Sequence, residues 1–102
     1  MALSFSHVAS WIDRGRANLR VGYTDVTFDD HPSSGVWSVD ADNFSKGIVL
    51  LKVFPENYAL GVSIQTAVDS NGDVYLSGWK ADGSAVTADL DGETIRFYWE
   101  GY

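Results

Sequence analysis

Three short turn signals divide the second half of the chain into evenly spaced segments and constrain its fold more than any other feature. They are Asn71-Gly72, Asp82-Gly83 and Asp91-Gly92. Asn, Asp and Gly tolerate the positive φ angles that both residues of a type I′ hairpin loop require. Because the segments between these pairs are rich in Val, Ile, Tyr, Phe and Trp, the pattern predicts four antiparallel strands joined as a meander.

The registers predicted from three two-residue loops agree with one another. In such a hairpin the residues that flank the loop are paired, so that Val68, for example, lies opposite Tyr75. One face of the sheet is then apolar and the other mostly polar, as expected for an antiparallel sheet with one face in water. The predicted apolar face comprises Val62, Ile64, Val68, Tyr75, Trp79, Val86, Ala88, Leu90, Ile95, Phe97 and Trp99. The predicted polar face comprises Ser63, Gln65, Ala67, Val74, Leu76, Gly78, Lys80, Ala85, Thr87, Asp89, Thr94, Arg96, Tyr98 and Glu100.

The first half of the chain must cover this apolar face. Residues 16–23 alternate between apolar and polar side chains, which predicts a strand that continues to Phe28 with a β-bulge near Asp25. Residues 35–41 predict a short strand. Residues 47–54 are apolar at both alternating positions, which predicts a central strand buried on both faces.

The first fifteen residues fit two alternatives. The first is a helix, whose apolar stripe is formed by Phe5, Val8, Ala9 and Ile12. The second is a strand that leads into a hairpin loop at residues 13–16, with its apolar positions at Leu3, Phe5, Ala9 and Trp11. Because Val8 and Ile12 interrupt the strand alternation, the helix is slightly favoured.

These patterns together predict a mainly β protein with one domain over residues 1–102. We expect a single antiparallel β-sandwich or flattened barrel with a C-terminal four-stranded meander and, under the first alternative, an N-terminal helix (α+β). A chain of 102 residues with 45% hydrophobic residues has room for one core. It has no cysteine, so disulfides and thiolate metal sites are excluded.

The charge of the chain bears on its partners. Seven Lys and Arg residues against fourteen Asp and Glu residues give a net charge of −7. This balance argues against direct binding to nucleic acid, which needs a basic surface, and favours partners with a basic surface. The charge is uneven, because the first twenty residues hold three arginines and one aspartate.

The sequence contains no motif that predicts catalysis, a cofactor or a metal. His7 and His31 lack the neighbours of a catalytic triad, and no phosphate-binding or dinucleotide-binding loop is present. Asp29 and Asp30 beside His31 are too few ligands for a metal. Residues 69–73 resemble the start of a calcium loop, but Val74 stands where that loop needs Gly, and a hairpin turn explains the same residues.

An acidic chain without catalytic residues suggests a protein-binding module. We expect a stoichiometric inhibitor or immunity-type protein that blocks a basic or nucleic-acid-handling partner. The predicted partner-binding residues lie in the loops and turns and comprise Asp29, Asp30, Trp37, Asp40, Asp42, Asp89 and Asp91.

Two alternatives stay open. One is a glycan-binding β domain, in which Trp11 and Trp37 are the candidate stacking platforms. The other is a structural subunit that self-associates as a homo-oligomer through a sheet edge. We expect a cytoplasmic protein without a membrane segment, because the start lacks the features of a secretory signal and the longest apolar run covers only residues 48–51.

Overall fold

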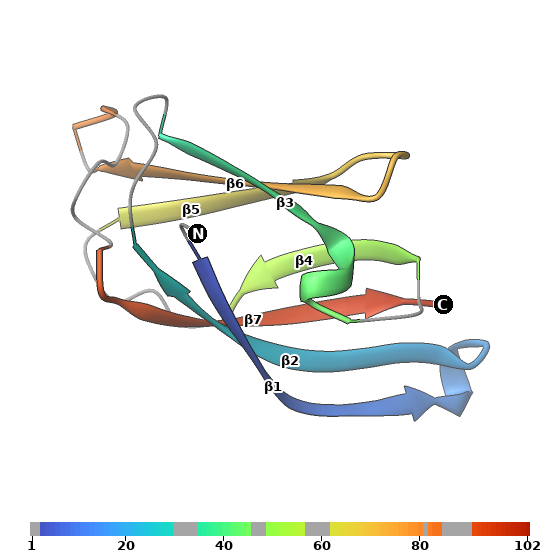
Figure 1. Cartoon of the computed structure of the whole chain (residues 1–102). Coiled ribbons are helices and arrows are strands. Elements are labelled where there is room, and N and C mark those ends of the chain that lie inside the picture. Colours follow the sequence, from blue (N-terminus) through green and yellow to red (C-terminus); the bar gives the residue numbers. More distant parts are fainter. Residues whose placement is uncertain (1–2, 30–34, 46–48, 57–61, 81, 85–90) are drawn as a thin grey trace.

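The chain forms two antiparallel β-sheets that pack face to face (Figure 1). The computed structural model describes residues 3–29, 35–45, 49–56, 62–80, 82–84 and 91–102. The four-stranded sheet has the order β1 (Leu3–Asp13), β2 (Leu19–Phe28), β7 (Thr94–Gly101) and β4 (Leu50–Pro55). The three-stranded sheet has the order β3 (Val36–Asp40), β6 (Asp73–Lys80) and β5 (Val62–Val68). The predicted mainly β, antiparallel sandwich is confirmed.

The N-terminal segment is a strand, so the favoured helix is wrong. β1 pairs with β2 through a tight connection that contains the short 3-10 helix η1 (Arg14–Arg16). A β-bulge at Val8 shifts the register between His7 and Ala9. Before the bulge the odd-numbered residues face the core, and after it the even-numbered residues do. This change of phase accounts for the interrupted alternation that made the segment resemble a helix.

Strand β2 is regular, so the bulge predicted near Asp25 is wrong. It pairs with β7 in an unbroken register from Arg20 to Thr27. The change of pattern along β2 has another cause, because its apolar residues lie on both faces of the sheet. Val26 and Phe28 face the core, whereas Val21 lies on the outer face beside Glu100.

The predicted four-stranded meander is wrong, because its last strand does not lie in the same sheet as its first two. β5 and β6 pair as expected, but the other neighbour of β6 is β3. β7 lies in the opposite sheet, between β2 and β4. A turn signal fixes where the chain reverses but not which sheet the next strand joins. Residues 85–90, which include the predicted core positions Val86, Ala88 and Leu90, lie outside the described residues.

The hairpin between β5 and β6 has a register one residue away from the predicted one. The N–H of Asp69 donates to the carbonyl of Asp73 and the N–H of Gly72 to the carbonyl of Asp69, so the loop has three residues. Gly72 takes the positive φ of 84° that closes this kind of loop.

A shift of one residue exchanges the two faces of a strand. Val74 and Leu76 are therefore buried, whereas Tyr75 and Trp79 are 37% and 39% exposed. The placement predicted for these four residues is wrong. The turn at Asp82-Gly83 also closes a three-residue loop, between Lys80 and Ser84.

Strand β4 is an edge strand, so the prediction of a strand buried on both faces is wrong. It pairs with β7 on one side, and the side chains of Leu51 and of Val49, which directly precedes the strand, are exposed. Only one of its faces meets the core, where Val53 packs beside Trp99.

Aromatic rings join the two sheets in the core. The ring of Phe28 in β2 lies 5.1 Å from that of Trp37 in β3 and 6.2 Å from that of Phe97 in β7. Ile95, Phe97 and Trp99 are all buried, as predicted for alternate positions of β7. Glu100, predicted to lie on a wet face, is also buried.

Gly22 is a point of close approach within the four-stranded sheet. A Cβ atom at this position would overlap with the ring of Trp99 and with the carbonyl oxygen of Ala9. Because Gly22 has no side chain, the indole of Trp99 can occupy the space beside it.

We expect Gly22→Ala to lower the free energy of unfolding by about 1–3 kcal/mol, because the added methyl group must displace Trp99 or the backbone of β1. Chemical denaturation measures the change. Gly15→Ala is the control, since a Cβ at Gly15 would meet its nearest neighbour, Asp13 Oδ1, at an ordinary 3.5 Å. Equal stability of the two variants would contradict the packing described for Gly22.

The register of β6 predicts different effects for neighbouring substitutions. Leu76→Ala should lower the free energy of unfolding by about 2–5 kcal/mol, because it leaves a cavity in the core. Tyr75→Ala should lower it by only about 1 kcal/mol or less, because that side chain is part of the surface. Urea denaturation measures both changes. A larger loss for Tyr75→Ala than for Leu76→Ala would support the register of a two-residue loop instead.

Candidate functional site

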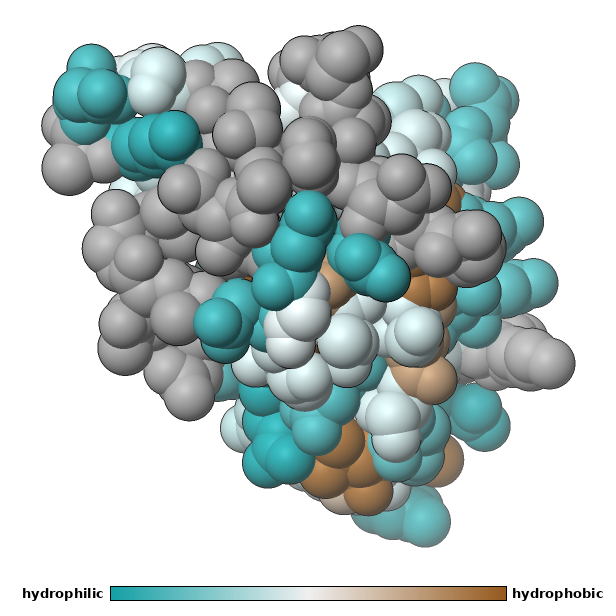
Figure 2. Space-filling view, turned by 60° about the vertical axis from the view of Figure 1, so that its left-hand side comes forward, coloured by the Kyte–Doolittle hydropathy of each residue, from teal (hydrophilic) through white to brown (hydrophobic). Residues whose placement is uncertain are grey.

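The structure does not bring the predicted acidic site residues together. Asp29 and Asp91 share one end of the sandwich, because Phe28 exchanges backbone hydrogen bonds with Gly92 and Glu93. Seen from this side, much of the described surface is hydrophilic (Figure 2). Asp40 and Asp42 lie at the far end of β3, where it leads into the 3-10 helix η2 (Ala41–Asn43).

The remaining predicted site residues do not complete a surface either. Trp37 is only 3% exposed and belongs to the core, so its predicted role as an exposed binding or stacking residue is wrong. Asp30 and Asp89 lie outside the described residues.

Acidic side chains stabilise turns in this protein, among them that of the predicted site residue Asp40. Asp40 caps η2, since its Oδ1 accepts a hydrogen bond from the N–H of Asp42 at 3.0 Å. Asp69 Oδ1 accepts from the N–H groups of Asn71 and Asp73, and its Oδ2 accepts from the hydroxyl of Tyr75. These bonds, above all the one from Asp73, lower the pKa of Asp69. Within the described part of the chain, no group of three or more His, Cys, Asp or Glu side chains could hold a metal ion.

A row of aromatic side chains crosses the outer face of the four-stranded sheet. It consists of Trp11, Tyr23, Tyr98 and Phe54, one from each strand, and we call it the aromatic row. The backbone register explains it, because Tyr98 is the partner of both Tyr23 and Phe54, and Trp11 lies diagonally across from Tyr23. The ring centroids are separated by 5.9 Å for Trp11–Tyr23, 5.5 Å for Tyr23–Tyr98 and 5.1 Å for Phe54–Tyr98.

The two ends of the aromatic row are open to solvent. Trp11 is 49% exposed and Phe54 39% exposed, whereas the two tyrosines between them are partly buried. Large apolar side chains that lie next to one another on a surface form a contiguous patch, and such patches mark sites of interaction.

On one side of the aromatic row, Glu100 forms ion pairs with Arg16 and Lys52. Arg16 Nη2 donates a hydrogen bond to Glu100 Oε1 at 3.1 Å, and Arg16 Nη1 forms an ion pair with Oε2 at 3.0 Å. The hydroxyl of Tyr98 donates to Glu100 Oε2 at 2.8 Å, and the Lys52 ammonium lies 3.7 Å from Oε1. A buried carboxylate with this many donors is held in one position.

The opposite flank carries a second ion pair. Arg96 Nε donates to Asp25 Oδ1 at 2.8 Å and Arg96 Nη2 to Oδ2 at 3.2 Å, a bidentate arrangement between β7 and β2. The aromatic row is therefore enclosed by paired charges of both signs.

Only part of this surface is predictable from the sequence. Trp11 is a predicted stacking platform, and Tyr98 is predicted to lie on the polar face of its strand, where the structure also has it. Its neighbours in space come from β2 and β4, and their pairing with β7 is not local in sequence. The strand alternative for the first fifteen residues, with its hairpin loop at residues 13–16, is the one signal that brings Trp11 close to Tyr23.

Comparisons with protein-family models, with curated proteins and with solved structures find no match to this chain. In the part of the chain that the structure describes, no helix has the length and apolar character needed to cross a membrane.

The ionisation of Glu100 links the outer face to stability. Burial raises the pKa of Glu100. The hydrogen bonds from Arg16 and Tyr98 and the charges of Arg16 and Lys52 together lower this pKa by more than burial raises it, so the net shift is downward. A carboxyl group whose pKa is lower in the folded than in the unfolded chain stabilises the fold above its unfolded pKa of about 4.3. This contribution is lost as the pH falls through the pKa of the folded state.

We expect Glu100→Gln to lose less free energy of unfolding than the parent protein when the pH is lowered from about 7 to about 3. The reason is that the variant has no charge to lose at this position. Urea denaturation at a series of pH values measures the difference. An identical pH dependence in the two proteins would show that the ion pairs of Glu100 do not stabilise the fold.

Proposed function

We propose that this chain is a non-catalytic module that binds a protein partner through the outer face of the four-stranded sheet. The observation that carries the proposal is the aromatic row, which offers Trp and Tyr side chains on the outer face of the sheet. Trp, Tyr and Arg are enriched among the residues that dominate the energy of protein interfaces.

The surroundings of the aromatic row support the same proposal. Protein interfaces have an apolar centre and a polar rim. Here the rings form the centre, and the ion pairs of Glu100 and Asp25 form the rim. Because the rim charges are already paired, a partner can approach without leaving an isolated charge buried.

The net charge supports a partner with a basic surface. A chain with a charge of −7 attracts cationic proteins at long range and speeds their association. We therefore propose a stoichiometric inhibitor or immunity-type protein, in which the acidic residues accelerate the encounter and the aromatic row supplies most of the affinity.

A glycan-binding module is the second candidate, because a row of aromatic rings with a half-exposed Trp11 could stack against sugars. The ring planes disfavour it. Successive rings are inclined by 42°, 63° and 46°, so that they do not share the common plane that suits a run of sugar rings.

Replacing Trp11 tests the proposal. We expect a basic protein to be retained from native lysate by immobilised parent protein and by the Trp79→Ser variant, but not by Trp11→Ser. Trp79 is the matched control, because it is a similarly exposed tryptophan on the opposite sheet. With the retained protein purified, Trp11→Ser should weaken binding by about tenfold or more, as for an interface hot spot. The association rate should fall as the salt concentration rises.

Three outcomes would contradict the proposal. Retention that is unaffected by Trp11→Ser would remove the aromatic row from the interface. Quenching of tryptophan fluorescence by polysaccharides in the parent but not in Trp11→Ser, without any retained protein, would favour the glycan-binding module. Self-association in light scattering, without a second partner, would favour the structural subunit.

A further inference from the structure

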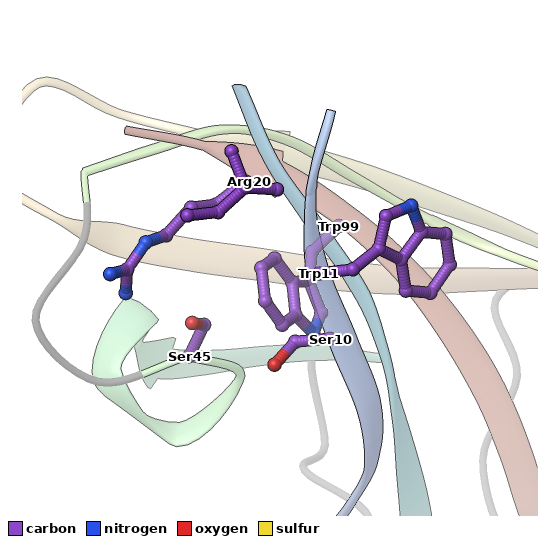
Figure 3. A pocket seen from close by; sticks show the side chains of 6 residues that line it. Ser10, Trp11, Arg20, Ser45 and Trp99 are labelled. Atoms are coloured by element: carbon purple, nitrogen blue, oxygen red, sulfur yellow. The ribbon is translucent and has the colours of Figure 1, made fainter. Parts of the chain in front are cut away.

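A pocket lies on the inner face of the hairpin formed by β1 and β2, on the side opposite the aromatic row. Its volume is about 240 Å3 and its lining residues are Ser10, Trp11, Ile12, Arg20, Ser45 and Trp99 (Figure 3). An adjoining pocket of about 440 Å3 shares Ser10, Arg20 and Ser45. The inner face is open here, because Ile12 and Arg20 are exposed whereas Val26 and Phe28, further along β2, are buried.

Small residues and a buried hydrogen-bond chain build the pocket. Ser10 and Gly22 are paired across β1 and β2, and the Trp99 ring lies against Gly22. The indole N–H of Trp99 donates to Thr24 Oγ1 at 3.1 Å, and that hydroxyl donates to the carbonyl of Phe44 at 2.8 Å. These two hydrogen bonds hold the indole in place and also tie Phe44, which precedes Ser45, to β2. The pocket is thus preformed by the core.

Three of the side chains that line the smaller pocket can donate hydrogen bonds, namely those of Ser10, Arg20 and Ser45. Figure 3 shows the Arg20 guanidinium extended toward η2 and Ser45, while the Trp11 ring lies on the other side of β1. Within the described residues, the side chain of Arg20 has no ion pair, in contrast to Arg16, Lys52 and Arg96. The hydroxyls of Ser10 and Ser45 add two further groups that can donate.

The lining also limits what could bind. Asp42 is the one carboxylate among the described side chains that line the two pockets, and it lies in the adjoining pocket only. In the smaller pocket Ile12 and the Trp99 ring provide apolar contact beside the donors.

We propose that this pocket binds a small organic oxyanion, a carboxylate or a phosphate ester with an apolar body. Arg20 would pair with the oxyanion, the serine hydroxyls would donate to its oxygens, and the apolar body would lie against Ile12 and Trp99. Guanidinium groups bind both anions with two parallel hydrogen bonds, so the chemistry is shared. Trp11 borders both this site and the aromatic row, but the groups proposed to bind the ligand lie on the inner face, and the proposal does not depend on the proposed function.

Nuclear magnetic resonance titration of the full chain tests the site, with benzoate, phenyl phosphate and the neutral benzyl alcohol as probes. We expect both anions to shift the signals of Ser10, Arg20, Ser45 and the Trp99 indole N–H in a saturable way, and benzyl alcohol to leave them unchanged. The tighter of the two anions identifies the class, carboxylate or phosphate. Arg20→Gln should weaken anion binding about tenfold or more, because a hydrogen bond to a charged group contributes at least that factor.

Arg14→Gln is the matched control, because Arg14 is an exposed arginine of the same hairpin that lines neither pocket. It should bind the anions as the parent does. Unchanged signals elsewhere in the spectrum establish that Arg20→Gln is folded. The proposal is overturned if neither anion produces saturable shifts, if benzyl alcohol binds equally well, or if Arg20→Gln binds as tightly as the parent.

Discussion

The alternation of side chains along β7 organises both faces of the molecule. As the strand between β2 and β4, it directs Ile95, Phe97 and Trp99 into the core. The residues between them, Arg96, Tyr98 and Glu100, supply the ion pairs and the central ring of the outer face. Because a strand has a period of two, core and candidate surface are set by the same register. A slip of one residue would expose the core and dismantle the surface together.

On the outer face, packing and electrostatics depend on each other. Arg16, Tyr98 and Lys52 all reach Glu100, which is nearly buried. A buried carboxylate needs such partners, because an unpaired charge in that position would be strongly destabilising. The contacts also fix Tyr98, which touches both Tyr23 and Phe54. The charged residues therefore hold the aromatic side chains in position as well as surrounding them.

Local signals in the sequence were informative where the structure is local. The pairs Asn71-Gly72 and Asp82-Gly83 marked true chain reversals, and the alternation in β7 identified its buried residues. The composition of the loop at Asn71-Gly72 does not determine its length, since both two-residue and three-residue loops place Gly at a positive φ. This difference of one residue decides whether Tyr75 or Leu76 faces the core. The bulge at Val8 concealed a strand. The choice of sheet for β7 and the position of β4 at an edge depend on contacts between distant segments, and the aromatic row depends on the same contacts.

Strand β1 takes part in both candidate sites, and it is an edge strand that pairs only with β2. Its Trp11 belongs to the outer face, and Ser10 and Ile12 line the pocket on the inner face. Most of its side chains are exposed, and we therefore expect it to open locally at a lower free energy than the buried strand β7. Opening of this strand would remove a wall of the pocket and one end of the aromatic row at once. Occupation of either site would favour the closed strand, and the two sites would thus be thermodynamically coupled, each ligand increasing the affinity for the other.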